Sequence, residues 1–150
     1  MKVFDFTELP GLVGQDLGTS DWHTVTQEQV NLFADATGDH QWIHVDVERA
    51  KAGPFGAPIA HGYLTLSLLP RFFVSAMRID GSRMGVNYGV NKVRFPSPVP
   101  VGSRLRGHFT LQSCEQVDNG GVQMVVLVTV EREGSAKPVC VAESVTRRYP

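Results

Sequence analysis

The chain has 150 residues, of which 42% are hydrophobic and 19% are charged, and its net charge is -1. These values are typical of one globular domain over residues 1–150, and they argue against nucleic-acid binding, which depends on clustered lysine and arginine. Neither a signal-peptide segment nor a run of ~18 apolar residues occurs, so we expect a cytoplasmic protein that does not span a membrane.

The first half of the sequence predicts helices. Thr26 begins "TQEQ", a capping box in which the Thr26 hydroxyl accepts from the Gln29 amide and the Gln29 side chain returns a bond. Apolar residues then recur at helical spacing, and Gly38 is a suitable C-cap. Asp46 can cap a second, short helix, "VERAKA".

A long, almost uncharged segment begins at His61 and reads "HGYLTLSLLPRFFVSAM". It is apolar on most faces, which predicts a helix buried inside the fold and kinked at Pro70. The second half predicts strands, which are "MGVNYGVNKVRF", "RLRGHFTLQSCEQV", "VQMVVLVTVERE" and "PVCVAESVTRRYP", with a hairpin turn at "DNGG". An antiparallel sheet wrapped around the helix would bury it, an α+β arrangement.

The stretch "ATGDHQWIHVD", residues 36–46, combines proton-transfer groups with an aromatic residue just after a predicted helix. Histidine can accept and donate a proton near neutral pH, and an aspartate beside it can hold a water or return a proton. Irregular backbone between Asp39 and His44 would let the two side chains converge. The alternative is structural, with Asp39 bonding its own turn and His44 packing against Trp42.

Three other interpretations concern this stretch and the helix that begins near His61. A metal site could draw on five residues, but no HExxH motif is present and we expect no metal; the five are Asp39, His40, His44, Asp46 and His61. Ser67 is not in a GxSxG elbow, and a serine within a helix usually bonds the preceding carbonyl. Gly62 begins the long helix, where an amide can stabilise an oxyanion, or where glycine simply gives room for packing.

The segments "FADATGDHQWIHVD" and "GAPIAHGYLTLSLLP" resemble the hydratase motif of the MaoC-like dehydratases, the (R)-specific enoyl-CoA hydratases. The form GDHQWIH is most similar to the nodulation-protein-N-like branch. The resemblance covers nearly the whole chain and implies the hot-dog fold, an antiparallel sheet around a long central helix. It makes Asp39 and His44 the catalytic pair, Ser67 a hydrogen-bonding residue of the site and Gly62 the oxyanion-hole amide.

One departure lies between the catalytic pair. Many family members have Asn-Pro where this sequence has Gln41-Trp42. Gln41 can supply the amide polarity of asparagine, but Trp42 lacks the fixed φ angle of proline. We therefore expect Gln41 to hydrogen-bond within the site and Trp42 to contact substrate as an aromatic anchor.

The implied reaction is reversible hydration of a trans-2-enoyl-CoA to an (R)-3-hydroxyacyl-CoA, with coenzyme A as part of the substrate and no other cofactor. Two alternatives stay open: a hot-dog acyl-CoA thioesterase and a non-catalytic acyl-thioester-binding protein. The presence of both Asp39 and His44 favours the hydratase.

A family resemblance and exposed sheet edges together predict a homodimer with acyl-CoA along the subunit interface. Cationic side chains on and before the strand "NKVRF" could bind coenzyme A phosphates, because cations suit phosphate oxygens. These are Arg83, Lys92 and Arg94. The alternative is that all three are ordinary solvated strand charges.

Overall fold

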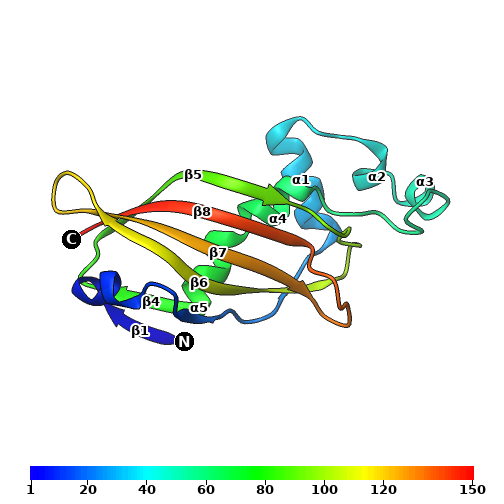
Figure 1. Cartoon of the computed structure of the whole chain (residues 1–150). Helices are drawn as coiled ribbons and strands as arrows, with labels where there is room; N and C mark the ends of the chain where they lie inside the picture. The colour runs from blue at the N-terminus through cyan, green and yellow to red at the C-terminus, as the bar shows by residue number, and fades with distance from the viewer.

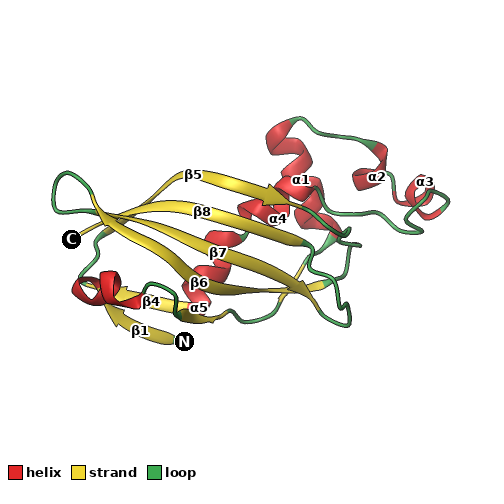
Figure 2. Cartoon of the chain, viewed as in Figure 1, coloured by secondary structure: helices red, strands yellow, loops and turns green.

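A curved antiparallel sheet wraps one side of a broken helix (Figures 1 and 2). The computed structural model describes residues 1–150. The sheet runs in the order β2-β6-β7-β8-β5, and β3 also pairs with β6. Its strands are β2 (Asp16–Thr19), β3 (His23–Thr24), β5 (Met84–Arg94), β6 (Arg104–Gln116), β7 (Val122–Arg132) and β8 (Cys140–Tyr149). The predicted α+β arrangement of a sheet around a helix is confirmed.

The core forms between the concave face of the sheet and the helix. Along β7, alternate residues from Val122 to Val130 are buried and the residues between them are partly exposed. This alternation follows from the two-residue period of a strand. Each buried valine or phenylalanine contributes ~1.5–3 kcal/mol, and Phe72 from the helix packs in the same cluster. The cluster contains residues from Leu9 to Ala142, so distant parts of the chain share one core.

The central helix is two helices, α4 (Gly62–Ser67) and α5 (Leu69–Ala76), separated at Leu68. The break confirms the predicted kink, because Pro70 in the first turn of α5 has no amide to donate to the preceding turn. The prediction that the helix is buried on most faces is wrong. Tyr63 is 70% and Val74 is 71% exposed, because the sheet covers only one side of the helix.

The helices before this one form a separate layer at one end of the sheet (Figure 1). They are α1 (Gln27–Thr37), α2 (Trp42–Val45) and α3 (Val47–Lys51). The Thr26 hydroxyl accepts from the Gln29 amide at 3.1 Å and Gly38 closes α1 with a φ of 81°, as predicted. The returning bond of the capping box is absent, because the Gln29 side chain accepts from His23 Nε2 at 2.9 Å instead. Asp46 caps α3 by accepting from the Arg49 amide at 3.1 Å.

The remaining elements lie at the other end of the molecule. They are β1 (Lys2–Asp5), the 3-10 helix η1 (Phe6–Leu12) and β4 (Met77–Asp80), and β1 pairs with β4 in parallel. The hairpin between β6 and β7 turns at Asn119 and Gly120, whose φ angles of 63° and 71° fit the predicted Asn-Gly turn. None of the helices has the length and apolarity needed to cross a membrane.

Candidate active site

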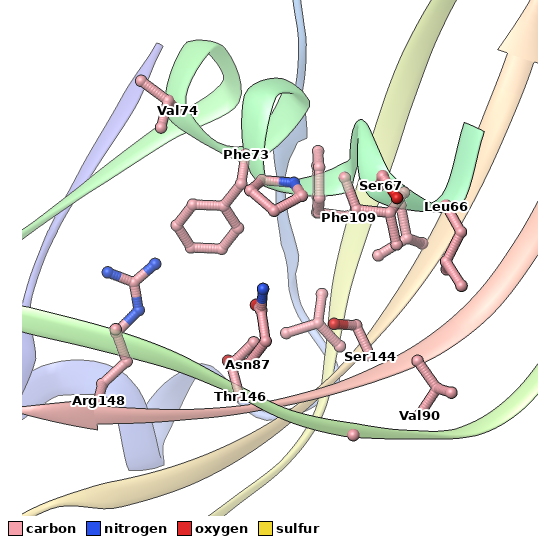
Figure 3. Close-up of a pocket in the computed structure, with 16 residues that line it drawn as sticks. Leu66, Ser67, Phe73, Val74, Asn87, Val90, Phe109, Ser144, Thr146 and Arg148 are labelled. Carbon is pink, nitrogen blue, oxygen red and sulfur yellow. The ribbon is translucent and has the colours of Figure 1, made fainter. Parts of the chain in front are cut away.

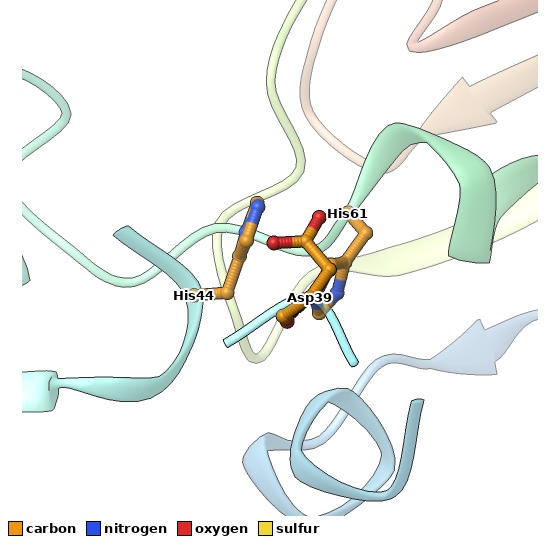
Figure 4. Close-up of side chains that lie close together, drawn as sticks. All are labelled: Asp39, His44 and His61. Carbon is orange, nitrogen blue, oxygen red and sulfur yellow. Dashed lines mark hydrogen bonds between the residues drawn. The ribbon is translucent and has the colours of Figure 1, made fainter. Parts of the chain in front are cut away.

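Asp39 and His44 come together beside His61 in a three-residue cluster (Figure 4). One ligand-type nitrogen or oxygen atom of each side chain lies within 4.8 Å of the others. Asp39 follows the left-handed Gly38 that ends α1, and its Oδ1 accepts from the Gln41 amide at 3.3 Å. The convergence that the spacing allowed is present, and the catalytic role of the pair remains a prediction.

The imidazole of His44 is held in one orientation. Its Nδ1 donates to the Ile59 carbonyl at 2.6 Å, which leaves Nε2 as the proton-accepting nitrogen. The side chain is only 6% exposed, and this burial lowers the pKa of His44, against a smaller opposing effect of the Ile59 hydrogen bond. The lowered pKa favours the neutral imidazole, which is the form that a general base requires.

His61 is the third member of the cluster, and the sequence indicated it only as a metal-ligand candidate. It is 3% exposed, and its ring stacks on His44 with centroids 3.9 Å apart and planes at 24°. Its Nε2 donates to the Asp39 main-chain carbonyl at 2.9 Å, and its buried Nδ1 has no hydrogen-bond partner. Phe33 packs against the same ring, with centroids 4.8 Å apart. His61 therefore links the backbone of Asp39 to the ring of His44.

The structure divides the five candidate metal ligands. Asp39, His44 and His61 lie together, whereas His40 pairs with Asp35 at 2.9 Å and Asp46 caps α3. The hydrogen bond that His40 Nε2 donates to the Asp35 carboxylate raises the pKa of the exposed His40. The cluster offers a carboxylate and two ring nitrogens, a set that can hold a water between acid–base groups or ligate a divalent cation. The expectation of no metal stays a prediction.

Gly62 is the first residue of α4 and directly follows His61. Its amide has no acceptor within the helix, because the first amides of any helix lack one. A Cβ at this position would lie 2.9 Å from the Phe95 ring, so glycine also allows this close packing. The oxyanion-hole and packing interpretations of Gly62 thus both have a physical basis. In the oxyanion-hole interpretation, a free amide lies beside the cluster.

Ser67 ends α4 and borders a cavity of about 620 Å³ between the central helices and strands β5 and β8 (Figure 3). Its hydroxyl donates to the Tyr63 carbonyl at 2.7 Å, as a serine within a helix usually does. Leu66 and Phe73 from the helices line this cavity together with Phe109, Val126 and Val128 from the sheet.

Gln41 and Trp42 make contacts within the chain, and their roles toward substrate remain predictions. Gln41 acts through its backbone, since its amide bonds Asp39 and its carbonyl accepts from the His44 amide at 3.0 Å. The Arg49 guanidinium lies 4.3 Å from the centroid of the Trp42 ring, and a Cβ at Gly53 would touch that ring. The Trp42 side chain therefore packs α2 against the segment that follows it.

The three cations proposed for phosphate binding do not form one group. Arg83 and Arg94 flank opposite ends of β5, and at 3.2–3.4 Å per residue they stand roughly 35 Å apart. Arg94 precedes Phe95, which contacts the Gly62 position, whereas the Arg83 amide bonds the carbonyl of Tyr149 at the other end. Lys92 and Arg94 are therefore at the end of β5 near the cluster, and Arg83 is not.

The MaoC like domain family matches residues 8–133 of this sequence. The chain belongs to the MaoC-like dehydratase family. It is 59% identical over 148 residues to the 3-hydroxyacyl-thioester dehydratase Z of Mycobacterium tuberculosis, covering 98% of each chain. It is 48% identical over 151 residues to nodulation protein N of Rhizobium leguminosarum bv. viciae, covering 97% of this chain and 92% of that protein.

A solved structure agrees with the fold. The (R)-hydratase from A. caviae involved in PHA biosynthesis superposes with a TM-score of 0.70 at 22% identity, over 92% of this chain and 96% of that chain. The predicted hot-dog fold and family resemblance are confirmed. This MaoC-like protein is thus an enzyme of the dehydratase, or hydro-lyase, class.

Proposed function

We propose that this protein is an (R)-specific enoyl-CoA hydratase, which adds water reversibly to trans-2-enoyl-CoA to give (R)-3-hydroxyacyl-CoA. One observation carries the proposal: Asp39 and the buried His44 converge, and His44 has one ring nitrogen fixed by Ile59 and the other free. The name of the relative at 59% identity, a 3-hydroxyacyl-thioester dehydratase, supports the substrate class.

The proposed mechanism places a water between the Asp39 carboxylate and Nε2 of His44. His44 takes a proton from this water as the oxygen bonds to C3, and the electron pair of the double bond moves into the thioester to form an enolate. The Gly62 amide stabilises the negative charge on the thioester oxygen. The proton then passes from the imidazolium to Asp39 and on to C2, so that one water is added and both residues are restored.

No metal or redox cofactor takes part in this mechanism, and coenzyme A enters only as part of the substrate. Lys92 and Arg94, at the end of β5 near the cluster, are proposed to bind its phosphates. A raised KM for crotonyl-CoA after Arg94→Ala is expected, and an unchanged KM would remove the phosphate role. Ser67 borders the space beyond Gly62 and is proposed to orient the acyl group.

We also propose that the protein is a homodimer, as expected from the sequence. Strand β5 lies at the edge of the sheet, so one side of its backbone has no neighbouring strand in the chain. Pairing of two β5 strands would extend one sheet into the next and would place acyl-CoA along the subunit interface.

Two competing functions predict different outcomes with the same substrate. A thioesterase would need its carboxylate or activated water to face the thioester carbon and would release free thiol. A non-catalytic protein would only bind the acyl thioester. The test is the absorbance of crotonyl-CoA: loss of the conjugated double bond without thiol release supports hydration. Thiol release supports the thioesterase, and an unchanged spectrum with measurable binding supports the non-catalytic protein.

A further inference from the structure

Arg148, near the end of β8, points into the cavity beneath α5 (Figure 3). Its guanidinium carbon lies 4.6 Å from the centroid of the Phe73 ring. Its Nε is buried and has no hydrogen-bond partner, and no carboxylate of the chain forms an ion pair with it. The cavity therefore contains a cation that the chain itself does not neutralise.

The neighbouring strand of the same sheet leaves space for this cation. Gly85 on β5 pairs in register with Arg148, and a Cβ at Gly85 would lie 3.1 Å from the guanidinium carbon. Two residues along each strand, on the same face of the sheet, Asn87 pairs with Thr146, and both line the cavity. An amide and a hydroxyl thus lie next to the guanidinium, whereas Leu66 and Val90 stand at the other end of the cavity (Figure 3).

The charge of the cavity therefore lies at the Arg148 end, whereas the end near α4 carries only uncharged side chains, among them Leu66, Val90 and Ser67. An unpaired cation in partly buried surroundings is costly, and burial accordingly lowers the pKa of Arg148. The cost is offset when a ligand brings a carboxylate, since a guanidinium can bind both carboxylate oxygens at once. The unpaired guanidinium thus favours a ligand with an anionic group at this end of the cavity.

The cavity is also placed to receive an acyl chain. Gly62 and Ser67 are the two ends of α4, and at 1.5 Å per residue they are about 7.5 Å apart along the helix. An acyl group whose thioester oxygen meets the Gly62 amide can therefore extend past Ser67 into the cavity. Its far end would then approach Phe73 and Arg148.

We propose that the cavity binds the far end of the acyl chain and that Arg148 pairs with a carboxylate there. The preferred substrates are then enoyl thioesters of ω-carboxylated acyl chains. This inference rests on the proposed hydratase function and goes further by assigning the substrate class and a specificity-determining residue.

The test compares trans-2-enoyl-CoA substrates of equal chain length that end in a carboxylate, in its methyl ester or in a methyl group. For the wild-type protein, kcat/KM is expected to be at least about tenfold higher for the carboxylate at the best chain length, a difference of about 1.4 kcal/mol. Arg148→Met keeps an apolar side chain against Phe73 and is expected to invert the preference. Equal or lower kcat/KM for the carboxylate across the series would overturn the proposal.

Arg147→Met is the matched control. Arg147 is the adjacent residue, and its guanidinium lies 3.8 Å from the centroid of the Tyr88 ring and bonds Gln123 rather than lining the cavity. The preference ratio should not change in this variant. If Arg148→Met does not fold, the wild-type comparison alone decides the question.

A binding measurement separates this proposal from the proposed function. Calorimetry with saturated acyl-CoA and its ω-carboxy counterpart needs no turnover. Tighter binding of the carboxylate supports the role of Arg148 even if crotonyl-CoA is not hydrated. Equal binding overturns that role even if hydration is observed.

Discussion

At the scale of single residues, the chemistry depends on how His44 and Asp39 are held. His44 uses Nδ1 on the Ile59 carbonyl, and Asp39 accepts from the Gln41 amide, so each side chain keeps a free atom for a shared water. We predict that Asp39→Asn and His44→Ala each reduce hydration by roughly 10²–10⁴-fold, the usual contribution of a general acid–base group. Steady-state kinetics on variants with native circular dichroism would check this. Folded variants with near-wild-type turnover would exclude the pair.

The pH dependence of the reaction follows from the pKa of His44. Burial lowers this pKa, so the imidazole stays neutral and able to accept a proton at pH values where an ordinary histidine is already charged. The acid limb of kcat/KM should therefore lie below the usual histidine value of about 6.5. A pH profile from acid to neutral pH measures it. A limb at or above that value would contradict the assignment of His44 as the base.

His61 is expected to act as a positioning residue. His61→Asn removes the ring that covers His44, so water reaches the imidazole and the acid limb should move up toward the ordinary histidine value, with kcat falling more than KM changes. A purely structural role would lower the melting temperature without moving the limb. His40→Asn is the control, because His40 is exposed and pairs with Asp35, and its profile should match the wild type.

At the scale of elements, the N-terminus of α4 can be tested with two variants that add the same bulk. Gly62→Ala and Gly62→Pro both place a Cβ against Phe95, but only proline removes the amide. Proline suits the first position of a helix, and the extended backbone of His61 (φ -60°, ψ 137°) suits a residue before proline. We predict that Gly62→Pro loses roughly 10²–10³-fold more kcat than Gly62→Ala. Equal losses would assign Gly62 to packing alone.

The elements also show what the sequence could predict. Caps at Thr26, Gly38 and Asp46 and the Asn-Gly turn were readable because each depends on a few neighbouring residues. Strands β1 and β4 could not be predicted, because four-residue strands show no clear alternation of apolar and polar residues. They also pair with each other across most of the first half of the chain. The exposure of Tyr63 was missed because hydrophobic residues alone do not reveal which side of a helix the sheet covers.

The site followed the same pattern. Asp39 and His44 could be proposed because they lie within one short motif. His61 lies 22 residues from Asp39, and only the fold shows that its ring stacks on His44 and bonds the Asp39 carbonyl. Arg148 lies farther still along the chain, and its unpaired position in the cavity depends on the register between β5 and β8.

For the whole molecule, the edge strand β5 indicates how two copies of the chain would associate. It is an edge strand with exposed apolar side chains, including Val86, Tyr88 and Val90, and such an edge tends to pair with another strand. We predict a two-fold homodimer with twice the 16.5 kDa mass of the chain. Light scattering at assay concentration measures this mass directly. A monomer's mass under those conditions would refute the dimer.

The stereochemistry of the reaction distinguishes an (R)-specific hydratase from an (S)-specific hydratase and from a thioesterase. The protein is incubated with (R)- or (S)-3-hydroxybutyryl-CoA, and the rise in absorbance of the conjugated enoyl thioester is recorded beside an assay for free thiol. The proposed function predicts dehydration of the (R) isomer only, loss of that activity in His44→Ala and no thiol release. Dehydration of the (S) isomer alone, or thiol release without the enoyl product, would contradict it.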